Sequence, residues 1–198
     1  MTTLDEAVAQ LAQSDAALRE AVAPLKAAQW SWKPDAATWS IAEVAEHLVL
    51  VERGILFRLR SAPADGLEKT EGKEQVLGQL TQRAVKFPAP ARLVPTGKYP
   101  VPVDFEIEMS TARAATLTWA QDADTHLQKH VMPHPAFGEL HGLQWLLMMA
   151  QHTLRHIAQI REVMAHPQYP AADSGETTIV DIVRKNTALF DHFPHTEK

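Results

Sequence analysis

Apolar residues recur every three or four positions along four long stretches of the chain, which is the period of an amphipathic helix. The stretches cover residues 3–26, about 40–59, about 104–130 and about 137–165. No convincing strand, in which apolar and polar residues would alternate, interrupts them. We therefore predict an all-α protein, a four-helix bundle with long crossover connections, whose sites are built from inward side chains on facing helices.

The second helix has the clearest start. In "SIAE", Ser40 can cap a free backbone N–H while Glu43, three residues later, reaches back to the Ser40 amide, as in a capping box. Asp104 is a candidate cap for the third helix, which Pro133 ends. His47 lies on the apolar stripe of the second helix, so we expect its side chain to face inward.

The connections between these helices are rich in helix-breaking residues. We expect a loop at residues 27–40 and a turn-rich linker at 61–73, followed by a short helix at about 72–86. Five prolines then exclude a continuous helix over residues 87–105. A long ordered loop of this kind often covers a functional site, although a plain surface crossover fits the composition equally well.

In this interpretation the chain divides into a bundle domain and a tail. The domain covers residues 1–165, and residues 166–198 form a tail, interrupted by proline and glycine, that packs on the bundle or on a partner. A short helix is expected within the tail, at about residues 178–190.

The composition excludes several classes of function, mainly because certain residues and patterns are absent. The chain of 198 residues has a net charge of −5 and no stripe of Lys and Arg, so nucleic acid is not an expected partner. No run approaches the roughly 18 apolar residues of a membrane span, and the first residues do not form a secretory signal. We therefore expect a cytoplasmic location. Because there is no cysteine, any transition metal must be bound by His, Asp or Glu.

Two histidines stand one helical turn apart in "AQHTLRHIAQI", residues 150–160. Side chains four residues apart share a helix face, with Cβ atoms about 6 Å apart, so His152 and His156 can reach one small object. His47, on the inner stripe of another helix, is the natural third ligand of a divalent metal ion. The alternative is three core histidines, each with one N–H bonded to a carbonyl. Burial favours the metal, because unsatisfied acceptor nitrogens would cost about 1–3 kcal/mol each.

Other polar residues are weaker candidates for the site. His126 and His130 have the same spacing, but they lie near the end of the third helix among charged neighbours. We predict surface or helix-terminal positions for this pair and for His134 and His141. Gln159, one turn beyond the histidine pair, either supports the site or is plain helix surface.

Two arginines and two tryptophans are further candidates. Arg53 and Arg155 could contact an anionic substrate but are more simply explained as surface cations. Trp39 and Trp145 are expected to fill the core, and Trp145, seven residues before the first histidine of the pair, could also form a wall of the pocket.

The chain lacks the motifs of several common enzyme classes. It has no Gly-rich phosphate loop and no nucleophile elbow. The segment from His152 to His156 also lacks the glutamate that metallopeptidases place after the first histidine as a general base. Peptidase chemistry of that type is therefore disfavoured.

Two segments together resemble the signatures of the DinB/YfiT-like superfamily of metal-dependent enzymes. The first, "ATWSIAEVAEHLVLVE", fits the pattern Trp-Ser-x-x-Glu-x-x-x-His at Trp39, Ser40, Glu43 and His47. The second, residues 134–160, ends in the pattern His-x-x-x-His-x-x-Gln at His152, His156 and Gln159. The number and order of the helices agree over roughly residues 3–165.

The resemblance implies a four-helix bundle with a three-histidine site for a divalent metal ion, commonly zinc or nickel, often in a homodimer. It implies either hydrolysis by an activated water or transfer of a low-molecular-weight thiol, such as bacillithiol or mycothiol, to an electrophile. The expected partners are therefore small molecules. A non-catalytic metal-binding scaffold of a stress response is the alternative, because the two patterns are specific for the family and not for the reaction.

Overall fold

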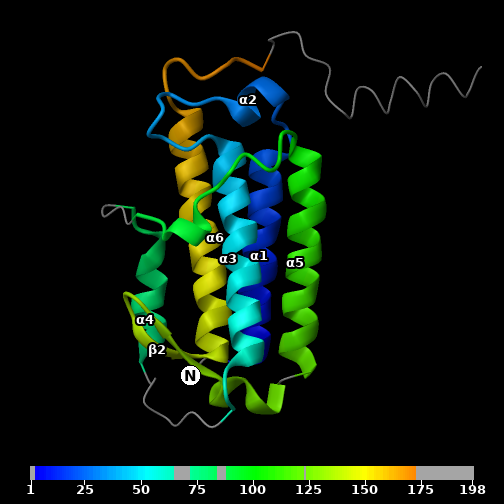
Figure 1. Cartoon of the computed structure of the whole chain (residues 1–198), viewed down its shortest axis with the longest axis vertical. Coiled ribbons are helices and arrows are strands. Elements are labelled where there is room, and N and C mark those ends of the chain that lie inside the picture. The colour runs from blue at the N-terminus through cyan, green and yellow to red at the C-terminus, as the bar shows by residue number, and fades with distance from the viewer. Residues whose placement is uncertain (1–2, 65–71, 84–87, 123, 173–198) are drawn as a thin grey trace, which may run out of the picture.

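Four long helices form a bundle in the computed structural model, which describes residues 3–64, 72–83, 88–122 and 124–172. They are α1 (Leu4–Val22), α3 (Ile41–Ser61), α5 (Pro102–Asp122) and α6 (Gly142–Met164). Contacts run around the bundle from α1 to α6, α3, α5 and back to α1. Figure 1 shows α1 and α6 running in one direction and α3 and α5 in the other. The predicted all-α class is confirmed.

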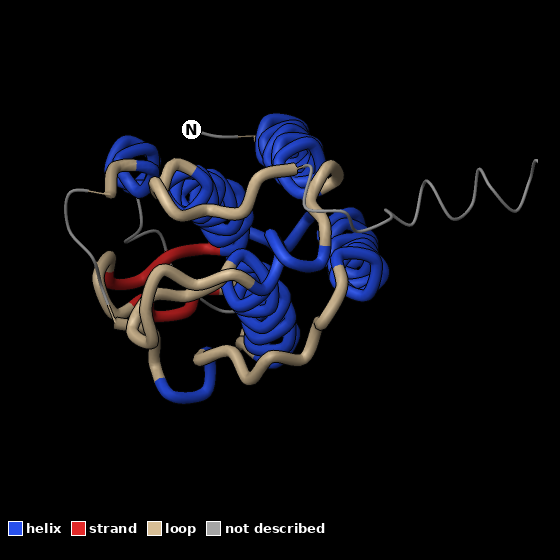
Figure 2. Tube along the Cα trace, turned by 90° about the horizontal axis from the view of Figure 1, so that it is seen from above, coloured by secondary structure: helices blue, strands red, loops and turns tan. Residues whose placement is uncertain are grey.

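Shorter elements fill the connections between the long helices. They are α2 (Ala27–Ser31), α4 (Lys73–Gly78), the 3-10 helices η1 (Gln79–Thr81), η2 (Ala91–Leu93) and η3 (Asp124–Lys129), and the strands β1 (Val131–His134) and β2 (Gly138–His141). Because α3 and α5 are parallel, the chain between them must return along the whole bundle, which is the predicted long crossover. Seen end-on, the strands lie beside α3 and α6 (Figure 2).

Several helix ends differ from the sequence prediction. The loop predicted at residues 27–40 begins with the short helix α2, and the short helix predicted at 72–86 ends its α-helical part at Gly78. The third long helix begins at Pro102, not at the predicted cap Asp104, and it ends at Asp122, well before the predicted end near residue 130. Proline is well suited to a first helical position, because the N–H that it lacks would have no partner there.

The fourth long helix begins at Gly142 and not near residue 137, because a β-hairpin precedes it. Val131 pairs with His141 and His134 with Gly138 in an antiparallel register. His141 then caps α6: its Nδ1 accepts from the Gln144 amide at 3.2 Å, and Gln144 Oε1 accepts from the His141 amide. From the sequence we expected no strand, and at this hairpin that prediction is wrong.

The predicted capping box at the start of α3 is confirmed. Ser40 Oγ accepts from the Glu43 amide at 3.1 Å, and the Glu43 carboxylate accepts from the Ser40 amide at 2.7 Å. Glu43 also pairs with Lys33 at 2.9 Å, which ties the preceding loop to the helix. Among the described residues, no helix is long and apolar enough to cross a membrane.

The described start of the tail packs against α2. Gln29 Nε2 donates to the Pro170 carbonyl at 3.1 Å, and the rings of His166 and Tyr169 contact Trp32. The helix predicted at residues 178–190 lies outside the described residues, and the domain boundary at 165/166 stays a prediction.

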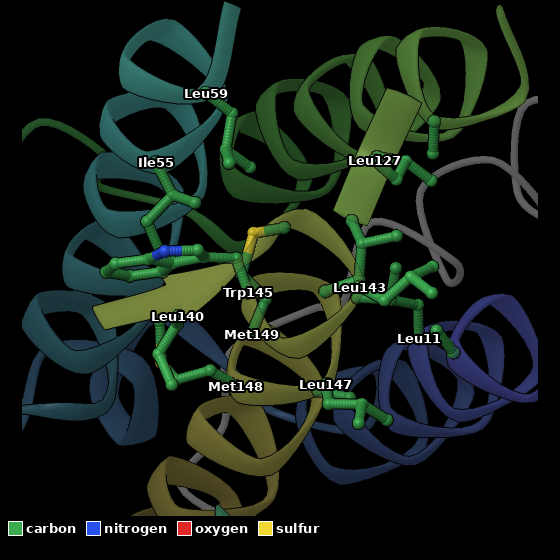
Figure 3. Close-up of a cluster of buried hydrophobic side chains, with 14 of the residues drawn as sticks. Leu11, Ile55, Leu59, Leu127, Leu140, Leu143, Trp145, Leu147, Met148 and Met149 are labelled. Carbon is green, nitrogen blue, oxygen red and sulfur yellow. The ribbon is translucent and has the colours of Figure 1, made fainter. Parts of the chain in front are cut away.

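Two apolar clusters form the core. Figure 3 shows one of them, at the end of the bundle where α6 begins, with Leu11, Leu59, Leu143 and Trp145 among its members. The other includes Leu18, Trp30, Ile41, Phe105 and Ile160. Buried polar side chains lie at or near the boundary between the clusters on each long helix, namely Ser14, Glu52, Arg113, Thr116 and Thr153. The core therefore has a polar layer at mid-height.

The strongest interaction in this layer is a buried ion pair. Arg113 Nε and Nη2 donate to the two Glu52 carboxylate oxygens at 2.7 and 2.8 Å, and both side chains are almost fully buried. Arg113 Nη1 donates further to the Leu11 carbonyl at 2.6 Å. The bidentate geometry satisfies the charges, and one guanidinium thereby links α1, α3 and α5.

Replacing Arg113 by methionine should lower the free energy of unfolding by about 3–5 kcal/mol, because it leaves the Glu52 carboxylate uncompensated in the interior. Replacing both residues by methionine should restore most of this loss, since a buried apolar pair of similar volume needs no compensating charge. Urea denaturation followed by circular dichroism measures both effects.

The ion pair between Arg53 and Glu108 is a matched control. It joins the same two helices, α3 and α5, but its side chains are 42% and 33% exposed. Arg53→Met should therefore cost less than about 1 kcal/mol. An equally small effect of Arg113→Met would show that the buried pair does not hold these helices together.

Candidate metal centre

The structure brings together the three histidines that the sequence singled out. His47 comes from α3, and His152 and His156 come from successive turns of α6. One ring nitrogen from each lies within 4.8 Å of the other two. The ring centroids are 4.4 to 5.3 Å apart. No second group of this kind occurs among the residues that the structure describes.

The tautomer of His47 is fixed by the Pro-rich segment. His47 Nδ1 lies 2.8 Å from the carbonyl oxygen of Leu93 in η2. A carbonyl can only accept, so Nδ1 carries the hydrogen and donates it. The Nε2 atom of this ring therefore keeps its lone pair, which is the form that a metal ion requires.

The tautomer of His156 is fixed by a chain of polar side chains. Its Nδ1 lies 2.9 Å from Gln159 Oε1, and Arg83 Nη1 donates to the same oxygen at 3.2 Å. Because a guanidinium can only donate, the atom facing it must be the amide oxygen, and Nδ1 of His156 must be a donor too. Arg83 is held in turn by Glu162, at 2.7 and 3.0 Å.

The positions of the lone pairs fit one shared ion. His156 Nε2, left without hydrogen by this reasoning, lies 3.1 Å from His152 Nε2. Ligand nitrogens around a tetrahedral ion with bonds of 2.0–2.1 Å are about 3.3 Å apart, close to this separation. The donor set of three imidazoles suits zinc, nickel or copper better than magnesium or calcium.

Burial keeps the three rings neutral. It lowers the pKa of His156 to about 3 and the pKa of His47 below its usual value, against the opposing hydrogen bond to Leu93. Burial, with the nearby His156 and His47, holds the pKa of His152 well below its usual value. Neutral imidazoles near pH 7 have lone pairs available for a metal.

The segment that supplies the Leu93 carbonyl is anchored by the residue next to His47. The buried Glu46 carboxylate accepts from the Thr96 amide and hydroxyl, both at 2.9 Å, and from the amides of Gly97 and Lys98 at 2.7 and 2.8 Å. Burial alone would raise the pKa of Glu46, but these hydrogen bonds outweigh it and lower the pKa. Glu46 is therefore a carboxylate at neutral pH.

A cavity of about 1130 Å³ opens beside the histidines. The Pro-rich segment forms one wall with Pro88, Pro90 and Leu93, and Trp39 adds another, with its ring 5.1 Å from the His47 ring. The predicted covering role of this segment agrees with its place in the wall. A cluster of lone pairs next to a chamber of this size leaves room for a small molecule.

A comparison with protein families agrees with this arrangement. The family model described as DinB superfamily matches residues 10–160. The chain belongs to the DinB superfamily. It is similar to an uncharacterized protein of Bacillus subtilis (strain 168), YuaE, with 28% identity over 135 residues, which is 66% of this chain and 80% of that protein. No solved structure matches significantly.

The other sequence candidates in this DinB-superfamily chain have structural roles. His130 is half-buried, its Nδ1 is 3.0 Å from the Ala62 carbonyl, and its ring contacts Trp119. The side chain of His126 lies outside the described part. His141, predicted near the surface, is buried as the cap of α6. His134 lines the cavity and stacks on Phe137 with centroids 4.6 Å apart.

The two arginines singled out in the sequence are both engaged. Arg53 forms the surface pair with Glu108. Arg155, expected at the surface, is buried and donates to the carbonyls of Leu80 and Gln82, which fixes η1 against α6. Arg155 nevertheless lines the cavity, as Gln159 and the buried Trp145 do.

Two residues of the site, Glu46 and Arg83, are hard to identify from the sequence. Glu46 is a charged residue in a long helix and resembles any exposed position, although its place next to His47 on a largely apolar segment is a hint. Arg83 lies in an irregular connection, where no period predicts which way a side chain points. Both are defined by contacts to segments distant in the sequence.

Glu46→Gln should loosen the segment around residues 92–98. The amide group offers one acceptor oxygen instead of two and turns an N–H₂ group toward backbone donors, so at least one donor loses its partner. We expect trypsin to cleave after Arg92 and Lys98 at least about tenfold faster, which corresponds to the loss of one or two charge-assisted hydrogen bonds. Mass spectrometry of timed digests measures the rates.

Glu20→Gln is the control for this experiment, because Glu20 is an exposed glutamate on another helix, α1. Cleavage after Arg92 and Lys98 should proceed in this variant as in the unmodified chain. Equal rates in Glu46→Gln would mean that the prolines alone hold the segment in place.

Proposed function

We propose that His47, His152 and His156 bind one divalent transition-metal ion and that the chain is a metal-dependent enzyme acting on a small molecule. The observation that carries the proposal is the convergence of three buried ring nitrogens, two of them fixed as lone-pair donors by hydrogen bonds on the opposite side of the ring. Such acceptors on the opposite nitrogen are the usual support of metal-binding histidines.

Three neutral ligands leave the charge of a dication uncompensated, so a bound ion would lower the pKa of a water or thiol next to it. The chain itself supplies the rest. Leu93 and Gln159 orient two of the rings, and Trp39 shields the His47 ring. The cavity admits a substrate beside them.

The reaction that we propose is hydrolysis or the transfer of a low-molecular-weight thiol to an electrophile. Both begin by making a nucleophile near neutral pH, and the chain has no cysteine that could act as one itself. Zinc and nickel are the proposed metals, since a site of imidazoles suits both. Assembly into a homodimer is part of the same proposal.

The cavity favours an enzyme over a non-catalytic metal-binding scaffold. Structural zinc sites are closed by four protein ligands, whereas catalytic sites have three and keep a position for water or substrate. Here the cluster has three histidines and borders an open chamber.

The metal content of the purified chain tests the binding site. We expect about one transition-metal ion per chain by mass spectrometry, and its loss in His47→Ala and His156→Ala while the circular dichroism spectrum stays helical. His130→Ala, which alters a half-buried histidine outside the cluster, should retain the ion. A chain that stays metal-free with zinc or nickel in excess would contradict the site.

Gln159→Leu should weaken metal binding about 10–100-fold, because His156 loses the acceptor that holds its Nδ1–H. Gln159→Glu keeps an oxygen in the same place and should retain most of the affinity. Competition with a chromophoric chelator measures both. Equal affinities for the leucine variant and the unmodified chain would show that Gln159 only fills space beside the ring.

The absorption spectrum of the cobalt-loaded chain separates the enzyme from the scaffold. An open position should let an added thiol such as cysteamine reach the ion and produce an intense thiolate-to-metal band. A site that is closed to small molecules would leave the spectrum unchanged. Colorimetric thiol-transfer and esterase assays on zinc-loaded and nickel-loaded protein then identify the reaction.

A further inference from the structure

The cavity extends far beyond the histidines along one face of α3. His47, Val51, Gly54, Ile55 and Arg58 all line it. Their spacing of three or four residues places them on one side of the helix. With a rise of 1.5 Å per residue, the eleven steps from His47 to Arg58 correspond to about 16.5 Å along the axis. The chamber is therefore elongated, and we call its part between the three histidines and Arg58 the channel. On the other side of the histidines the cavity continues past Trp39 to Val163 and His166.

The middle of the channel is apolar and open. Trp145 and Met148 of α6 line it together with Val51 and Ile55 of α3. Gly54 leaves the space free, because a Cβ atom built at this position would meet no atom within 4 Å. The apolar lining and the unused space at Gly54 suit the body of an apolar ligand.

The end away from the histidines is positively charged. Arg58 and Arg92 line the channel and together border a smaller hollow with Pro133, His134 and Pro135. Arg58 is held in place by the Pro133 carbonyl at 3.3 Å and by the Trp145 ring, 5.8 Å from its guanidinium carbon. Among the described residues, neither arginine is ion-paired with a carboxylate.

The charges of the other two arginines that line the cavity are engaged by neighbouring groups. Arg83 is neutralised by Glu162 and donates to Gln159. Arg155 is held by two backbone carbonyls. The charge that is available to a ligand therefore lies at the end formed by Arg58 and Arg92.

We propose that the channel binds an elongated small molecule with an apolar body and an anionic end, a carboxylate or a phosphate, which Arg58 and Arg92 bind. The guanidinium groups offer several donors to such an anion in a geometry that suits both chemistries. This inference rests on the proposed function for the other end of the molecule, which lies at the histidines and carries the reacting group.

A matched pair of fluorescent probes tests the anionic end. Anilinonaphthalene sulfonate and phenylnaphthylamine share an aromatic body, and only the first carries a negative charge. With zinc-supplied full-length protein, we expect the double variant Arg58→Gln with Arg92→Gln to bind the sulfonate at least about tenfold more weakly, while its affinity for the neutral probe changes less than about threefold. Arg60→Gln, an exposed arginine of α3 outside the channel, should bind both probes normally.

Gly54→Phe tests the channel itself. The new ring would project into the open middle of the channel and should weaken the binding of both probes. The metal content should stay at the level of the unmodified chain. Displacement of the sulfonate probe by decanoate, by decyl phosphate and by uncharged decanol then distinguishes a carboxylate from a phosphate. We expect one of the two anions to displace the probe at a concentration at least about tenfold lower than decanol does.

Equal losses of both probes in the arginine double variant, or displacement by decanol as effective as by either anion, would overturn the proposal. So would sulfonate binding that survives Gly54→Phe, since the probe would then lie elsewhere on the protein. These outcomes are independent of the metal site. His47→Ala should lose the ion and still bind the sulfonate probe, so a failure of the anionic end and a failure of the metal centre give different results.

Discussion

A buried imidazole has two nitrogens, and each must find a partner of the right kind. In this bundle the protein provides hydrogen-bond acceptors for the Nδ1 atoms of His47 and His156, and the Nε2 atoms of both rings keep their lone pairs. Much of the surrounding structure serves this requirement. The Leu93 carbonyl must be brought to α3, and Gln159 must present oxygen instead of nitrogen, which the Arg83 guanidinium ensures.

The crossover between α3 and α5 explains how a carbonyl becomes available in the interior of a helical protein. Carbonyls inside a long helix are bonded to their own helix, so a free one must come from a helix end or from irregular backbone. Prolines keep the helical part of this segment to the single turn η2, and Leu93 is the last residue of that turn. The amides of the segment, in turn, need an acceptor, and Glu46 provides one for three consecutive residues. Two adjacent side chains of α3, Glu46 and His47, thus bind the same segment and depend on each other.

The four long helices and the convergence of the three histidines could be predicted from the sequence, because both follow from the helical repeat of three to four residues. A stripe of apolar residues identifies the inner face of α3, and the inner face includes His47. The hairpin before α6 was missed because its strands are four residues long and contain Pro133, too short to show alternation. Glu46 and Arg83 were missed for another reason: each acts on a segment at least 50 residues away, and no local pattern encodes such a contact.

The first part of helix α3 has no face left for solvent alone, and 13 of the helix's 21 residues are buried. At 100° per residue, Glu46 and Glu52 point about 100° and 140° away from His47. One carboxylate faces the Pro-rich segment, the second faces Arg113 in the polar layer, and the imidazole faces the cavity. The carboxylate in the buried ion pair and the imidazole beside the cavity therefore lie on different sides of one helix. The ion pair with Arg113 joins α3 to α5 on one side, while His47 and Arg58 line the same cavity on the other side.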